Sequence, residues 1–88
     1  MNNVLRLAIV DPDDKARELF KNMLLGMERV WLEAECSRYE FFSDVVAQTE
    51  PDIVIVAVDE DQEQALRLVE QINHTSPECN ILVTCSSS

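Results

Sequence analysis

The segment PDIVIVAV at residues 51–58 decides the fold. Its apolar run, Ile53–Val58, is unbroken and mostly β-branched, which is typical of a strand covered on both faces of a parallel sheet. LRLAIV at Leu5–Val10 is a second mostly apolar run, and residues 81–84 or 81–85 form a third. Apolar and polar residues alternate along Val30–Cys36, which predicts a strand with one wetter face near a sheet edge.

Three stretches with helical periodicity separate these strands. In each stretch, apolar residues recur three or four positions apart and so form one buried stripe. The stripes consist of Ala16, Leu19, Phe20, Met23 and Leu24; of Phe42, Val45, Val46 and Thr49; and of Ala65, Leu68, Val69 and Ile72. The alternation of strands and helices predicts an α/β fold with a parallel sheet and right-handed crossovers, formed by residues 1–88 as one domain.

Characteristic residues mark the helix ends. Asp11 is placed to cap the first helix, with Pro12 in its first turn. Gly26 is placed to end that helix in the left-handed conformation, which glycine accepts. Ser37 and Glu40 have the spacing of a capping box, which predicts the start of the second helix.

The charge balance excludes several classes of function. The chain has 17 acidic and 7 basic residues and a net charge of −10. This field repels phosphate backbones and anionic headgroups, so we expect neither nucleic-acid nor membrane binding by this domain. No apolar run reaches the roughly 18 residues of a membrane-spanning helix. Gly26 is the only glycine, which excludes the glycine-rich phosphate loops.

The remaining reactive and aromatic side chains indicate no catalytic site. Cys36, Cys79 and Cys85 are widely spaced and form no metal-ligand pattern, so we expect small core residues in a reducing cytoplasm. His74, the only histidine, falls in the last turn of the third helix, where a positive charge is favourable. We expect Trp31 to pack under a neighbouring helix, with contact to a partner protein as the alternative.

In an open parallel sheet, functional sites lie beyond the carboxyl ends of the strands. The sequence places Asp11 and Asp13 after the first strand, residues 57–60 after the third, and residues 84–87 after the fourth. An acid cluster that faces hydroxyl groups suits Mg²⁺ and a phosphoryl group. The same acids are typical of helix N-termini, so Asp11 and Asp13 are candidates either for metal ligands or for helix caps.

Three segments of this chain, LRLAIVDPDD, PDIVIVAV and TCSSS, resemble the first four-fifths of a response-regulator receiver domain of the CheY-like type. The resemblance implies a flavodoxin-like fold with strand order 2-1-3-4, truncated before the fourth helix and the fifth strand. It also implies a cytoplasmic module of two-component phosphorelay signal transduction rather than an enzyme. The sequence is further similar to the atypical receivers at the N-termini of ParA-like ATPases of pilus assembly. Truncation would leave the fourth strand as an exposed apolar edge, so we expect a longer chain or self-association through that edge.

The resemblance places the phosphoacceptor aspartate six residues after Pro51, where this chain has Ala57. Alanine has no oxygen that could accept a phosphoryl group. Asp59 is a weak substitute, because it lies roughly 6–7 Å farther along a continuing strand.

The resemblance also places two adjacent acids on Asp11 and Pro12, so one of the usual Mg²⁺ ligands is missing. Asp13 is the candidate to replace it, together with Asp11. The switch hydroxyl at the end of the fourth strand falls on Thr84 or Cys85.

These residues lead to two hypotheses about function. In the first, the domain is an atypical receiver that acts without phosphorylation or a cofactor, through self-association or a C-terminal effector domain. In the alternative, a histidine kinase phosphorylates a working receiver whose rearranged Mg²⁺ pocket contains Asp11, Asp13 and Asp59. A third possibility is an α/β fragment with no site of its own.

Overall fold

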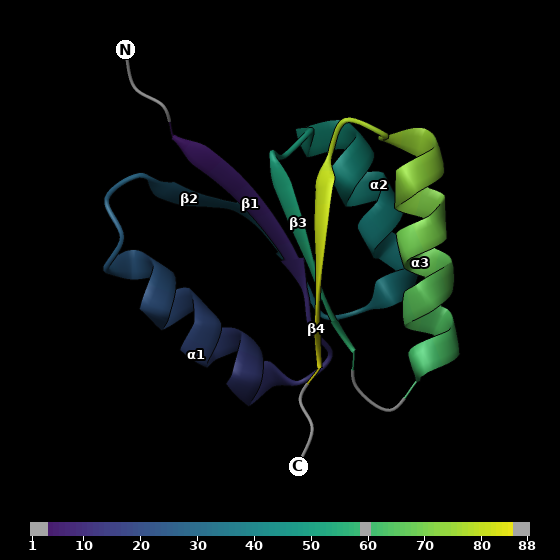
Figure 1. Cartoon of the computed structure of the whole chain (residues 1–88). Helices are drawn as coiled ribbons and strands as arrows, with labels where there is room; N and C mark the ends of the chain where they lie inside the picture. Colours follow the sequence, from purple (N-terminus) through teal and green to yellow (C-terminus); the bar gives the residue numbers. More distant parts are fainter. Residues whose placement is uncertain (1–3, 59–60, 86–88) are drawn as a thin grey trace.

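The computed structural model describes residues 4–58 and 61–85, and these residues form one parallel sheet with three helices (Figure 1). The strand order is β2-β1-β3-β4. The elements are β1 (Leu5–Val10), α1 (Asp14–Leu25), β2 (Val30–Cys36), α2 (Tyr39–Thr49), β3 (Ile53–Val58), α3 (Gln62–Thr75) and β4 (Asn80–Cys85). The predicted fold class and strand order are confirmed.

The helices cover the sheet unequally. α2 and α3 lie together on one face, and α1 lies alone on the other (Figure 1). The larger core cluster lies on the α2–α3 face and includes the fully buried Phe42, Val46 and Ile72. The smaller cluster, on the α1 face, has only four buried members: Leu7, Ile9, Leu24 and Ile55.

The face that α1 covers is therefore more open than its stripe predicts. Leu24 is the only buried residue of α1, whereas Leu19 is 70% exposed and Met23 is 54% exposed. Trp31 is 59% exposed, so the prediction that it packs under a helix was wrong. Cys85 is also exposed rather than in the core. No helix within the described residues is long and apolar enough to span a membrane.

β2 contains a bulge that its sequence does not reveal. Leu32 is the partner of Leu7, but Ala34, two residues on, is the partner of Ala8, so Glu33 is an extra residue in the ladder. Leu32 consequently packs with the α1-face cluster and Ala34 with the α2–α3 cluster. The alternation of β2 does not mark a single wetter face, because a bulge reverses the side on which the following residues project.

The helix ends also differ from their sequence signals. Asp13, not Asp11, is the N-cap of α1, and Pro12 precedes the helix. Gly26 does follow α1, but with φ of −83° it is right-handed rather than left-handed. The left-handed cap occurs instead at Glu50, where φ is 47°, after α2.

The capping box at the start of α2 does not form. The N-cap is Arg38, whose side chain makes no capping hydrogen bond, and the helix begins at Tyr39. At the start of α3, by contrast, the Asp61 carboxylate accepts a hydrogen bond from the backbone N–H of Gln64 at 3.0 Å. The capping role expected of the acids before α3 is confirmed for Asp61.

Candidate functional site

The carboxyl ends of β1, β3 and β4 lie at one end of the sheet. Val10 is the partner of Val56, and Ala57 is the partner of Thr84. Side chains alternate along a strand, so Ala57 projects to the same face as Ile55, which is the α1 face. Thr84 lies beside it on that face, and Asp11 follows Ile9 by the same alternation. Cys85, the other candidate for the switch position, is the partner of Val58 on the next row.

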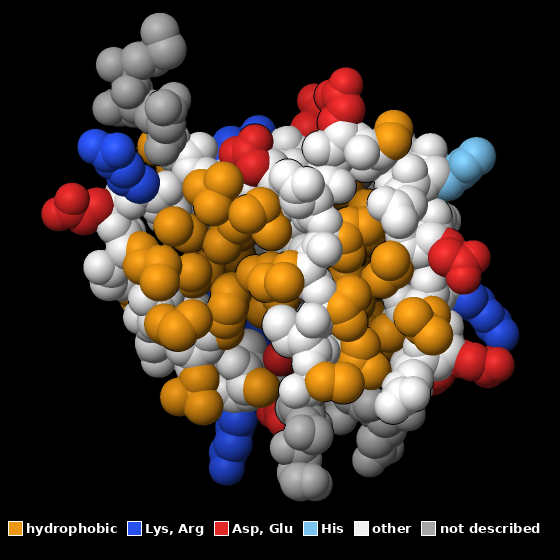
Figure 2. Space-filling model, viewed as in Figure 1, with side chains coloured by type: hydrophobic (Ala, Val, Ile, Leu, Met, Phe, Trp, Pro, Cys, Tyr) orange, Lys and Arg blue, Asp and Glu red, His pale blue; other side chains and the backbone are white. Residues whose placement is uncertain are grey.

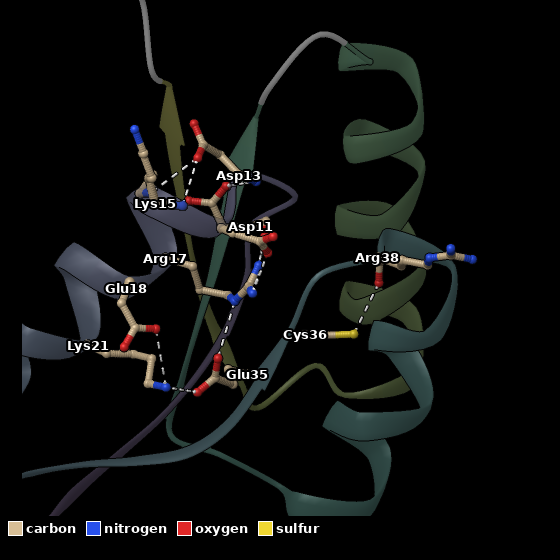
Figure 3. Close-up of polar contacts among 11 residues, drawn as sticks. Asp11, Asp13, Lys15, Arg17, Glu18, Lys21, Glu35, Cys36 and Arg38 are labelled. Carbon is tan, nitrogen blue, oxygen red and sulfur yellow. Dashed lines mark hydrogen bonds and ion pairs between the residues drawn. The ribbon is translucent and has the colours of Figure 1, made fainter.

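Asp11 and Asp13 together form the turn that leads into α1. Asp11 is buried, and its Oδ1 accepts a hydrogen bond from the backbone N–H of Asp13 at 2.9 Å. The Oδ1 of Asp13 in turn accepts hydrogen bonds from the N–H groups of Lys15 and Ala16, at 3.0 and 3.2 Å (Figure 3). These contacts satisfy backbone donors of the turn and of the first helical turn. Both predicted metal ligands are therefore engaged in building the turn.

Arg17 ties this turn to α1 and β2. Its Nη1 donates to the backbone carbonyl of Asp11 at 2.7 Å, and its Nη2 donates to Asp14 at 2.6 Å. Its Nε donates to Glu35 of β2 at 3.2 Å (Figure 3). The hydrogen bond with Asp14 is the main cause of a raised pKa of Arg17. A permanent positive charge consequently lies within the acidic turn.

Glu35 joins two cations of α1 to the edge strand. Besides Arg17, it contacts the ammonium of Lys21 at 2.7 Å. The pKa of Glu35 is lowered, first by the hydrogen bond from Lys21 and then by the one from Arg17, against the opposing effect of burial. Sequence reasoning missed this network. The i,i+3 spacing of Asp14 and Arg17 could have indicated their pair, but the contact with Glu35 depends on the bulge in β2.

Ala57 lies at the position where the resemblance places the phosphoacceptor. Its backbone carbonyl accepts a hydrogen bond from the phenol of Tyr39 at 2.5 Å, and Tyr39 itself is buried against the α2–α3 core. This contact fastens the start of α2 to the end of β3, and sequence reasoning did not find it. Asp59, the weak substitute for the phosphoacceptor, lies outside the described residues.

The described residues provide no evident metal centre. Within residues 4–58 and 61–85, no group of three or more His, Cys, Asp or Glu side chains is arranged to hold a metal ion. The hollow at this end of the sheet has a volume of about 280 Å³ and lies beside Tyr39 and Asp61. Its lining includes Pro12, but neither Asp11 nor Ala57.

Solved structures with the same arrangement of strands and helices are response-regulator domains. The response regulator domain of Thermotoga maritima CheB matches with a TM-score of 0.84 at 12% identity, over 94% of this chain and 61% of that one. The isolated REC domain of Salmonella enterica RcsB, solved with the phosphomimetic BeF₃⁻, gives 0.84 at 16% identity over 98% and 64%. The chain has the receiver fold.

An aspartate-to-alanine mutant of the response regulator MaeR, bound to sulfate, has the same receiver fold. It matches with a TM-score of 0.80 at 10% identity, over 97% of this chain and 70% of that one. The chain thus spans about three-fifths of the length of the CheB and RcsB domains. No family model and no curated protein matches the sequence.

Proposed function

We propose that this chain is an atypical receiver module that acts through protein–protein contacts and does not take a phosphoryl group at position 57. The observation that carries the proposal is Ala57 at the carboxyl end of β3. A methyl group cannot attack phosphorus, and the adjacent carbonyl is already bonded to Tyr39. Transfer to another atom would require a nucleophile placed to within about an ångström of the in-line position.

The acidic turn supports the same function. Pro12 occupies the position of the second acid, and Asp11 and Asp13 each use an oxygen in the turn itself. Arg17 adds a positive charge that would oppose a divalent cation nearby. We therefore expect no resident Mg²⁺ and derive no step that uses one.

Magnesium affinity can be measured by thermal unfolding. A ligand that binds the native state with a Kd of 1 mM would stabilise it by about 1.4 kcal/mol at tenfold excess. We expect no such shift with MgCl₂, compared with an equal ionic strength of NaCl. A magnesium-specific rise in Tm that disappears in Asp11→Asn would contradict this part of the proposal.

Phosphorylation itself is tested with acetyl phosphate or with beryllofluoride in the presence of Mg²⁺. We expect neither a mass gain of about 80 Da nor a beryllofluoride adduct. The alternative, a working receiver phosphorylated by a histidine kinase, predicts an adduct that Asp59→Asn abolishes and that Asp44→Asn, a change on the exposed side of α2, leaves intact. That pattern would overturn the proposal.

The output of the module is expected to come from a partner rather than from an active site of its own. We propose a cytoplasmic protein in which this module self-associates or contacts a C-terminal effector domain, as in the atypical receivers of pilus-assembly ATPases. The RcsB structures concern the interaction of that response regulator with DNA. For this domain, the net charge of −10 argues against direct contact with DNA, because phosphate groups would be repelled.

A further inference from the structure

β4 is the outer strand of the described sheet on the side opposite β2. It pairs with β3, and no described strand pairs with its other edge. Leu82 is 54% exposed and Val83 is 47% exposed, so the strand presents apolar side chains to both faces. Figure 2 shows hydrophobic side chains on both sides of β4, towards α1 and towards α3. An edge of this kind is a template for pairing with another strand.

The charge distribution favours a second copy of the chain at this edge. A protein with a net charge of −10 repels its own copies wherever its acids face one another. The segment Asn80–Cys85, NILVTC, contains no acidic or basic residue. Two copies can therefore approach along β4 without placing carboxylates opposite each other.

The order of residues in β4 is also self-complementary. Two identical strands related by a two-fold axis perpendicular to the sheet run antiparallel, and each face of one sheet continues into the same face of the other. Paired residues must then project to the same face, so their residue numbers must differ by an even number. With the axis at Leu82, Ile81 lies opposite Val83 and Asn80 lies opposite Thr84. Apolar residues thus pair with apolar ones and polar residues with polar ones.

We propose that β4 is the interface of a homodimer, in which it pairs antiparallel with β4 of a second copy about a two-fold axis at Leu82. The two sheets become one continuous sheet of eight strands, with an antiparallel junction between two parallel halves. The apolar surfaces on both sides of β4 then meet their counterparts in the other copy. This proposal names a partner for the interaction module, but it does not depend on the absence of phosphorylation.

Sedimentation equilibrium of the 88-residue chain tests the dimer. We expect a species of twice 10.0 kDa at micromolar concentration. Leu82→Lys places two ammonium groups opposite each other at the axis and should weaken the dimer about tenfold or more. Leu25→Lys is the matched control, because Leu25 is 83% exposed in the last turn of α1, beside β2 at the opposite edge. This variant should remain dimeric.

A pair of double variants tests the register without changing the apolar residues. Asn80→Lys with Thr84→Glu puts each new ammonium opposite a new carboxylate, so it should dimerise at least as tightly as the wild type, with added sensitivity to salt. Asn80→Lys with Thr84→Lys creates two like-charge pairs and should be monomeric. Circular dichroism checks that each variant is folded.

Three results would overturn the proposal. The first is a wild-type chain that remains monomeric, and the second is a folded Leu82→Lys variant that dimerises as the wild type does. The third is equal dimerisation of the two double variants, which would exclude this register. A monomeric wild type would leave the beryllofluoride test of position 57 unaffected, so the two proposals fail separately.

Discussion

Replacing Arg17 with glutamine should weaken the whole carboxyl end of the sheet, because one guanidinium joins three segments there. Its bond to the carbonyl of the buried Asp11 is worth about 1.5 kcal/mol, as a hydrogen bond from a charged donor. The pair with Glu35 adds about 0.5 kcal/mol, since Glu35 is partly exposed. Asp14 is 82% exposed at its side chain and adds little. The expected loss in the free energy of unfolding is about 2 kcal/mol.

Urea unfolding followed by circular dichroism measures this loss, and thermal unfolding should show a fall in Tm of about 8–16 °C for a domain of this size. Arg67→Gln is the matched control. Arg67 also pairs with a carboxylate on its own helix, that of Glu63, but at 3.8 Å and with both side chains more than three-quarters exposed. It should cost less than about 0.5 kcal/mol. Equal losses for the two variants would refute the argument that Arg17 organises the turn.

The loss should also depend on pH. The pKa of Glu35 is held below its ordinary value of 4.5, first by Lys21 and then by Arg17. A lowered folded-state pKa contributes stability above the unfolded-state pKa, and this contribution is lost as the pH falls through the folded-state value. The difference in stability between the wild type and Arg17→Gln should therefore narrow below about pH 4.5. A difference that stays constant down to the acid transition would show that Glu35 contributes nothing through Arg17.

Three further substitutions test the packing around the site. Phe42→Ala empties a fully buried position and should cost about 3–5 kcal/mol, whereas Phe41→Ala, at a 55% exposed position next to it, should cost less than about 1 kcal/mol by urea unfolding. Tyr39→Phe removes the hydrogen bond to the Ala57 carbonyl and should cost about 1 kcal/mol; no change would mean that this bond does not hold α2 to β3. Trp31, the only tryptophan, should be quenched by acrylamide almost as strongly in the native as in the unfolded chain, and a shielded native signal would contradict its 59% exposure.

The sheet and its helices could be predicted from the sequence because burial imposes periodicity. A strand covered on both faces requires an unbroken apolar run, and Ile53–Val58 is found at the expected bounds. Ala65, Leu68 and Ile72 are all buried, as the stripe of α3 predicts. These patterns depend only on which face of an element is dry, so they survive without knowledge of the neighbours.

Features that depend on neighbours could not be predicted in this way. The stripe of α1 overestimates burial at Leu19, because periodicity shows which face of a helix is apolar and not how much of that face is covered. The bulge at Glu33 leaves the letters of β2 unchanged while reversing the faces of the residues after it. The contact between Arg17 and Glu35 joins two elements through that bulge, so pairwise spacing along the chain contains no trace of it.

The contacts of the site also bear on how such a module could be controlled. A switch needs two states and a ligand that binds one of them more tightly. At the carboxyl end of this sheet the cation is Arg17, which is part of the chain and cannot be exchanged, and the position for a covalent change holds Ala57. Under the proposed function, nothing at this end can bias two states. If β4 is the dimer interface, the remaining variable is the concentration of the chain itself, because the dimer fraction rises with it by mass action. The module would then report its own abundance or local clustering, rather than a phosphoryl signal.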